Sequence, residues 1–266
     1  MGTKMANQPV FYTLVQVKFN TIANMADYAP NVQEVLRHKG FPDYQSVSMQ
    51  QMTIQVQNDG TAPVPVQSEV QRWFFHNAEK TSGYILLSDS LVYQSTAYEN
   101  FPHFSTKLIE GLEIVSEAVG GLAFVERIGM RYLDAVIPNE GETLQQYLDT
   151  SLVGGLSNTV GRIGHRLTET LSFTETGTLI ARSLITSGGL PVPPDLFPLS
   201  LSLDKKYEMQ LGEVAVLDTD HFWSGRESFN LTSVKDRLDS LHADVSTTFL
   251  ASVTPFARQA WGDSGV

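Results

Sequence analysis

Cysteine is missing from this chain, and so is any long apolar run. The first absence excludes disulfide bonds, thiolate catalysis and metals bound through cysteine. The second leaves no segment near the roughly 20 apolar residues that a membrane-spanning helix needs. The N-terminus also lacks the charged and then apolar pattern of a signal peptide. We therefore expect a cytoplasmic protein that does not enter a membrane.

Basic residues are few. The 266 residues include 18 Lys and Arg against 29 Asp and Glu, which gives a net charge of -11. Lys205 and Lys206 form the only adjacent basic pair. Binding to a phosphate backbone requires a basic patch, so no nucleic-acid partner is predicted. An acidic balance favours solubility or a basic protein partner instead.

The common sequence motifs of enzyme chemistry are also missing. No Gly-x-Ser-x-Gly element marks a nucleophilic serine, and the paired glycines are not followed by the residues of a phosphate-binding loop. The six histidines do not show the spacing of a His-x-x-x-His metal site. We therefore predict neither a cofactor nor a bound metal.

The first half of the chain carries a pattern of strands and amphipathic helices. Residues 11–19 alternate between two faces, which predicts a strand, and a helix with Pro30 in its first turn and Gly40 at its end follows. Residues 101–120 carry apolar side chains every three or four positions, which predicts a long helix. Turn residues separate candidate strands of an antiparallel meander at 45–56, 70–75, 84–87 and 90–97.

The second half repeats this arrangement more loosely. Its expected elements are a helix at 143–152, a hairpin at 162–173 and 178–186, an extended segment at 201–218, and a final helix opened by a capping box at Ser233 and Asp236. The Gly- and Pro-rich loop 187–198 is long enough to be a functional loop or lid.

These patterns predict an α+β protein of two related halves, each a mostly antiparallel sheet with helices packed on one face. We place a tail at 1–8, one half at 9–140 and the other half at 141–266. Whether the two halves share one continuous sheet is left open.

The strand expected at 124–136 carries the most informative residues. Alternate residues of a strand share a face, so Arg127, Gly129 and Arg131 should point the same way, while Ile128 and Met130 point to the core. A half-buried guanidinium must meet a carboxylate, a carbonyl or a bound anion. Gly129 would let a ligand approach the backbone closely. This face is the candidate site for a ligand or partner.

A second segment echoes the first. The sequence Arg127-Ile-Gly-Met-Arg131 recurs as Arg162-Ile-Gly-His-Arg166. If the two strands are neighbours, four guanidiniums would converge on one patch that suits phosphate or carboxylate groups. The alternative interpretation is that this five-residue match is a coincidence. Arg162 and Arg166 are therefore weaker site candidates than Arg127 and Arg131.

A competing hypothesis is a metal-assisted or acid–base hydrolase. Asp218, Asp220 and His221 stand close together in the sequence, and Glu126 could supply a further carboxylate. Carboxylates and imidazole suit several divalent ions and also general acid–base chemistry. The alternative interpretation is that these residues cap the backbone or form ion pairs, because no motif identifies further ligands.

Four segments carry a family resemblance: Val15-Gln-Val-Lys-Phe19, Phe124-Val-Glu-Arg-Ile-Gly-Met-Arg-Tyr132, Leu217-Asp-Thr-Asp-His-Phe222, and a final helix with Leu241-His242 and Phe249. In these segments the chain resembles a sporadically distributed family of uncharacterised prokaryotic proteins. The resemblance implies no established activity. The patchy distribution of that family is typical of accessory genes, including defence and toxin–antitoxin modules.

The leading prediction is a non-enzymatic binding or regulatory protein. It would recognise a protein partner or a small anionic ligand through the arginine-bearing strand face and the loop 187–198, with Arg127 and Arg131 holding the ligand. A third interpretation makes the arginines internal supports and the chain a homodimeric scaffold, because open sheet edges favour self-association.

Overall fold

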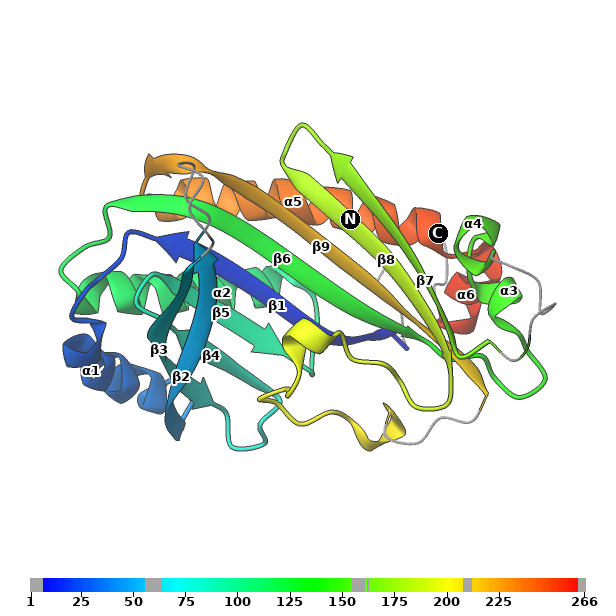
Figure 1. Ribbon diagram of the computed structural model, residues 1–266, viewed down its shortest axis with the longest axis horizontal. Coiled ribbons are helices and arrows are strands. Elements are labelled where there is room, and N and C mark those ends of the chain that lie inside the picture. Colours follow the sequence, from blue (N-terminus) through cyan, green and yellow to red (C-terminus); the bar gives the residue numbers. More distant parts are fainter. Residues whose placement is uncertain (1–6, 56–63, 155–160, 162, 208–211, 263–266) are drawn as a thin grey trace.

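The computed structural model describes residues 7–55, 64–154, 161, 163–207 and 212–262. Within these residues the chain forms one nine-stranded sheet and six α-helices (Figure 1). The strands are β1 (Val10–Phe19), β2 (Asp43–Gln55), β3 (Val64–His76), β4 (Ser82–Leu86), β5 (Ser90–Ser95), β6 (Phe124–Val136), β7 (His165–Phe173), β8 (Thr178–Ser187) and β9 (Glu213–Ser228). The helices are α1 (Met25–His38), α2 (Phe101–Ala118), α3 (Leu144–Tyr147), α4 (Thr150–Val153), α5 (Leu231–Ser252) and α6 (Pro255–Ala260), with 3-10 turns η1 (Pro194–Leu196) and η2 (Lys205–Tyr207). The predicted α+β class is confirmed.

The sheet runs in the order β2-β3-β4-β5-β1-β6-β9-β8-β7, and its neighbouring strands are antiparallel. β1 and β6 meet at its centre, where Val15 lies opposite Met130. β6 in turn pairs with β9 along its length, so strand pairing crosses the expected boundary at residue 140. The two halves therefore share one continuous sheet.

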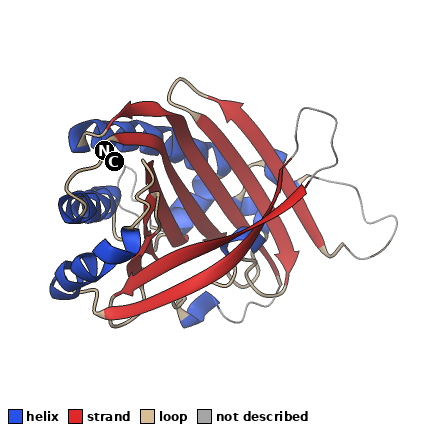
Figure 2. Ribbon diagram, turned by 60° about the vertical axis from the view of Figure 1, so that its left-hand side comes forward, coloured by secondary structure: helices blue, strands red, loops and turns tan. Residues whose placement is uncertain are grey.

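One face of the sheet packs against helices (Figures 1 and 2). The larger core on this face joins Ile128 and Met130 of β6 to Leu112 of α2 and to Leu238 of α5. A smaller core packs α3 and α6 against the far end of the sheet. The four-residue spacing of apolar side chains along α2 gives that helix its buried stripe, as predicted. No helix in the described part of the chain is long and apolar enough to cross a membrane.

The opposite face is crossed by residues 188–207, which we call the strap and which Figure 1 shows in yellow in front of the sheet. Leu201 and Tyr207 of the strap are buried against Phe11 and Leu133 in a third core. The backbone N–H of Ser202 donates to the carbonyl of Lys80 at 2.8 Å. The predicted functional loop is thus the first part of a packed layer that covers the second face of the sheet.

Three sequence expectations differ from the structure. The expected extended segment at 201–218 is irregular as far as Tyr207, and β9 begins at Glu213 and continues to Ser228. Instead of one helix at 143–152, two short helices form. The final helix starts at Leu231, because the Asn230 side chain accepts a hydrogen bond from the Ser233 N–H at 3.0 Å and caps the helix earlier than the predicted capping box.

Candidate functional site

The predicted alternation of β6 is confirmed at its arginines. Ile128 and Met130 lie in the helix-side core, so Arg127, Gly129 and Arg131 point toward the strap. A bulge between Val125 and Arg127 shifts the strand register at its start.

Glu126 lies beside this bulge on the surface. Its side chain is 46% exposed and stands 3.7 Å from Nε of Arg226. Within the described residues no hydrogen bond or ion pair joins it to Asp218 or Asp220, so the structure does not bring the four residues of the hydrolase hypothesis together.

Arg131 is held by carboxylates on two sides. Its Nε donates to Asp218 Oδ1 at 2.6 Å, and its Nη2 donates to Asp218 Oδ2 at 2.7 Å. Its Nη1 and Nη2 also donate to Asp195 at the start of η1. Burial works against the charged form, but the two carboxylates raise the pKa of Arg131 above its ordinary value. Arg131 therefore joins β6, β9 and the strap.

Arg127 fills the space beside Gly129. Its Nη1 donates to Gln16 Oε1 at 2.9 Å, and its Cζ lies 4.4 Å from the ring centroid of Phe222. A Cβ atom at residue 129 would stand 2.9 Å from Nη1 of Arg127 and 3.0 Å from Cβ of Phe222. Gly129 thus makes room for a side chain of its own strand and for the neighbouring strand, where the sequence had suggested room for a ligand. Burial lowers the pKa of Arg127, although Asp220 opposes that shift.

A third guanidinium, which the sequence analysis missed, comes from β8. Arg182 lies opposite Asp218 in the strand register, and its Nη1 donates to Asp218 Oδ2 at 3.3 Å. Its Nε donates to Glu169 Oε2 at 2.6 Å. The sequence around Arg182 shows only the usual alternation of a strand and gives no sign of a site. Its role follows from the pairing of β8 with β9, which places it opposite Asp218.

The predicted convergence of the two arginine motifs is wrong. β9 and β8 lie between β6 and β7, so the two motifs are not on neighbouring strands. Arg166 lies opposite Ile185, a residue of the helix-side core, and its Nη1 donates to Glu213 Oε1 at 3.0 Å. It therefore faces away from Arg131. Arg162 lies outside the described residues.

A pocket of about 300 Å³ opens where these charges meet. It is lined by Arg131, Leu167, Arg182, Leu184, Pro193, Pro194, Asp195, Val216, Asp218 and Asp220. Within the described part of the chain, Asp220 makes no side-chain hydrogen bond and no ion pair within 4.0 Å. Burial raises the pKa of Asp220, while Arg127 and Arg131 work in the opposite direction.

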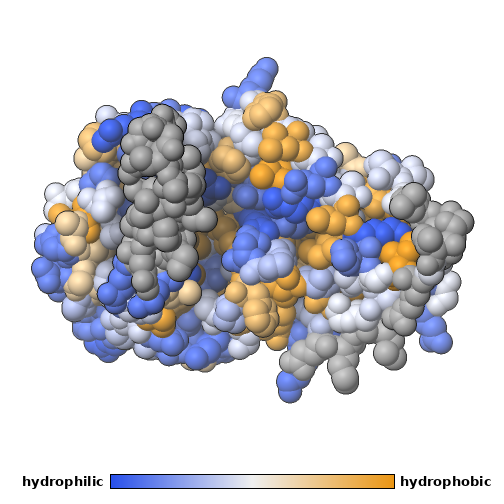
Figure 3. Space-filling model, viewed as in Figure 1, coloured by the Kyte–Doolittle hydropathy of each residue, from blue (hydrophilic) through white to orange (hydrophobic). Residues whose placement is uncertain are grey.

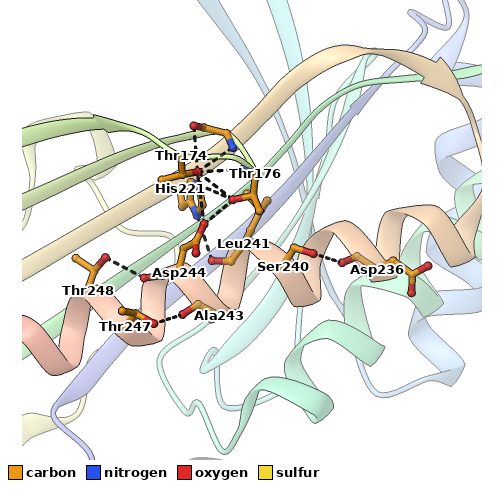
Figure 4. Close-up of polar contacts among 11 residues, drawn as sticks. Thr174, Thr176, His221, Asp236, Ser240, Leu241, Ala243, Asp244, Thr247 and Thr248 are labelled. Atoms are coloured by element: carbon orange, nitrogen blue, oxygen red, sulfur yellow. Dashed lines mark hydrogen bonds and ion pairs between the residues drawn. The ribbon is translucent and has the colours of Figure 1, made fainter.

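His221 points to the other face of the sheet and is fully buried (Figure 4). Its Nδ1 lies 3.1 Å from the carbonyl oxygen of Leu241 on α5, so Nδ1 carries the proton. Its Nε2 then accepts a hydrogen bond from the Thr174 hydroxyl at 3.1 Å and lies 3.3 Å from the Thr176 hydroxyl, which donates its one proton to Asp244. The Thr176 hydroxyl also lies 2.5 Å from Asp244 Oδ2. This network ties the β7–β8 turn to α5.

Adjacent residues of β9 therefore do not form a common site. Asp218 and Asp220 face the strap, whereas His221 faces α5, because successive side chains of a strand point to opposite sides. In the part of the chain that the structure describes, no group of three or more His, Asp or Glu side chains is placed to hold a metal ion.

Comparison with known proteins gives no match to a family model, to a curated protein or to a solved structure. The family resemblance of the sequence segments stays a prediction, and function is argued from the site alone.

Proposed function

We propose that this protein is a non-enzymatic binding protein that recognises a protein partner at the strap-side pocket. The observation that carries the proposal is the pocket itself. It combines apolar lining residues, such as Leu167 and Leu184, with the Asp220 carboxylate, which has no hydrogen bond within the described residues. Pockets that recognise ligands have this composition, in which a few polar groups are set among apolar ones.

An apolar surface continues from the pocket along β7. Leu167 is 59% exposed, Leu171 is 52% exposed and Phe173 is 86% exposed, and the three lie on one face of this strand, with Glu169 between the two leucines. Figure 3 shows apolar side chains gathered over the β7–β8 hairpin, beside a hydrophilic band. β7 is also an edge of the sheet. Exposed apolar patches with a polar rim are typical of protein interaction sites.

A protein partner fits this pocket better than a small anion. Arg131 was the expected anion ligand, but its donors already meet Asp218 and Asp195. Arg127 meets Gln16 and the ring of Phe222. An anion would have to displace a carboxylate from a buried, charge-assisted pair, which costs several kcal/mol.

The hydrolase alternative receives no support from the same geometry. Its histidine faces α5, and its two aspartates face the strap. A general acid–base pair must share one site within hydrogen-bond reach of the substrate.

We also propose that the two halves have a common origin. The repeat is visible when the chain is divided before β6 and not at residue 140: one unit starts with the central strand β1, the other starts with β6, and in each a long helix, α2 or α5, follows the last strand. In each unit the last strand of the meander returns to pair with that central strand. The matching strand order supports two related units that were joined edge to edge.

The test is native mass spectrometry of the tagged protein, purified gently from its own host. Leu167→Arg changes the exposed wall of the pocket, and we expect it to remove a stoichiometric protein partner. Leu250→Arg is the matched control, because Leu250 is 48% exposed and lies on α5, which packs on the opposite face of the sheet. A partner that stays bound to Leu167→Arg, or that is lost equally from both variants, would overturn the proposal.

A further inference from the structure

The charged group of the pocket whose hydrogen bonding is least satisfied within the described residues is an acceptor. Arg131 donates to Asp218 and Asp195, and Arg182 donates to Glu169 and Asp218. Asp220 alone among the carboxylates that line the pocket has no hydrogen bond within the described residues. A carboxylate accepts hydrogen bonds and donates none when it is ionised. A ligand that completes the site must therefore bring donors to Asp220.

The charge of the site points the same way. Three guanidiniums stand against four carboxylates around the pocket: Arg127, Arg131 and Arg182 against Glu169, Asp195, Asp218 and Asp220. One negative charge is left without a counterion in the described structure. The net charge of -11 on the whole chain adds a long-range attraction for a basic partner.

The burial of Asp220 strengthens this preference. Burial raises the pKa of Asp220 even though Arg127 and Arg131 lower it. The neighbouring cations thus do not fully compensate the cost of keeping this carboxylate ionised. A further cation in contact with Asp220 would favour the ionised form.

The shape of the pocket suits a long side chain. Leu167, Leu184 and Val216 line the pocket from the strands of the sheet, and Pro193 and Pro194 line it from the strap. A lysine or arginine stem packs on apolar surfaces of this kind while its charged end reaches a polar group. At about 300 Å³ the pocket has room for one side chain, since it lies at the small end of the roughly 300–1,000 Å³ of ligand pockets.

We propose that the pocket binds a lysine or arginine side chain presented by the protein partner, with the cationic group on Asp220 and the stem between the leucines and the prolines. This inference rests on the proposed function, because it names the part of the partner that the pocket takes. The partner segment is identified by its chemistry: an exposed basic side chain on an apolar stem.

The test uses four small probes and the full chain with isotope-labelled leucine and valine methyl groups. The probes are the Nα-acetyl amides of lysine, arginine, norleucine and glutamate. The reporters are the methyl signals of Leu167, Leu184 and Val216, which line the pocket. We expect saturable shifts of these signals with the lysine and arginine probes, at affinities on the order of millimolar for such small ligands.

Two comparisons decide whether the carboxylate is responsible. Asp220→Asn should weaken the lysine probe at least about tenfold, while Asp236→Asn on α5, which removes an exposed carboxylate outside the pocket, should leave it unchanged. The norleucine probe has an uncharged stem and should bind at least about tenfold more weakly than lysine to the unaltered protein. This second comparison needs no substitution and so does not depend on how a variant folds.

Three results would overturn the inference: shifts with the glutamate probe but not with lysine, equal affinity for norleucine and lysine, or no shift with any probe. The proposed function is tested separately. If Leu167→Arg releases the partner while the basic probes do not bind, the pocket is the partner site and the ligand class is wrong. If the basic probes bind while Leu167→Arg keeps its partner, the inferred chemistry is right and the partner binds elsewhere.

Discussion

Arg131 is the clearest case of a residue whose role changed between sequence and structure. The sequence required a carboxylate, a carbonyl or a bound anion for it and favoured a bound ligand, whereas in the structure it is 7% exposed and paired with Asp218 and Asp195. The same physical requirement, that a buried charge must have a partner, holds in both cases. The partners come from β9 and from the strap, far away in the sequence.

Loss of Arg131 should therefore destabilise the fold. Arg131→Met leaves Asp218, whose side chain is 4% exposed, with only the longer contact to Arg182. We expect a loss of about 3–5 kcal/mol in the free energy of unfolding, measured by urea denaturation. Arg166→Met, which breaks the more exposed pair with Glu213, should cost at most about 1 kcal/mol. Similar losses from the two variants would contradict the structural role of Arg131.

Asp134 gives a prediction about pH. This residue lies on the helix side of β6, is 7% exposed, and makes no side-chain hydrogen bond within the described residues. Burial raises the pKa of Asp134 from 3.8 to about 7. Between these values the folded protein keeps a proton that the unfolded chain has released. The free energy of unfolding should thus fall by about 4 kcal/mol from this group as the pH rises from about 4 to 7.

Asp134→Asn isolates that contribution, since asparagine is neutral at every pH. The stability of the variant relative to the unaltered protein should rise across the same pH window and then level off above about pH 7. His242, whose pKa burial lowers to about 4, changes stability in the opposite direction, but it is present in both proteins. Thermal or urea unfolding at several pH values measures the difference in the free energy of unfolding between the two proteins. A difference that does not vary with pH would refute the assignment.

At the scale of elements, the β7–β8 hairpin is held at its turn by the histidine network. The turn reaches α5 through the Thr174 and Thr176 hydroxyls, His221 and Asp244. In the sheet β7 has β8 as its one neighbouring strand among the described residues, and this network adds a contact at the outer end of the apolar surface proposed for the partner.

Thr176→Val removes the hydroxyl that contacts both His221 and Asp244 and keeps the shape of the side chain. We expect amide hydrogen exchange of residues 173–178 to become at least about tenfold faster, with little change in β6. Thr170→Val, on the exposed part of β7, is the matched control and should leave this exchange unchanged. Unaltered exchange in Thr176→Val would show that strand pairing alone holds the turn.

At the scale of the whole molecule, the shared sheet couples the two halves. β6 pairs with β1 on one side and with β9 on the other, and α5 contributes Leu238 to the larger core and Phe249 to the smaller one. Neither half has a complete core without the other. We therefore expect one cooperative unfolding transition.

Two single-tryptophan variants can check this expectation. Trp73 is buried in the first half and Trp261 in the second, and the chain has three tryptophans. In a variant that keeps only Trp73 or only Trp261, with the others changed to Phe, fluorescence and far-ultraviolet circular dichroism should give the same urea midpoint. A fluorescence midpoint that departs from the dichroism midpoint in either variant would indicate that the halves unfold separately.

The sequence by itself determined the class of the fold, the long helices and the strand β6. It also determined that the two arginines of β6 share one face of that strand. These features follow from short-range periodicities of two and about 3.6 residues, which the chain shows directly. The same reasoning recognised Asp218 and Asp220 as candidate site residues, but it grouped them with His221 because the three are close in the sequence.

Only the tertiary structure decided which charges meet. The order of strands placed Arg182 beside Asp218, separated the two arginine motifs and sent His221 to the opposite face. The strap brought Asp195 to Arg131 across 64 residues of sequence. Pairings of this kind depend on long-range strand order and on the close packing of a loop, and neither leaves a periodic signal in a single sequence.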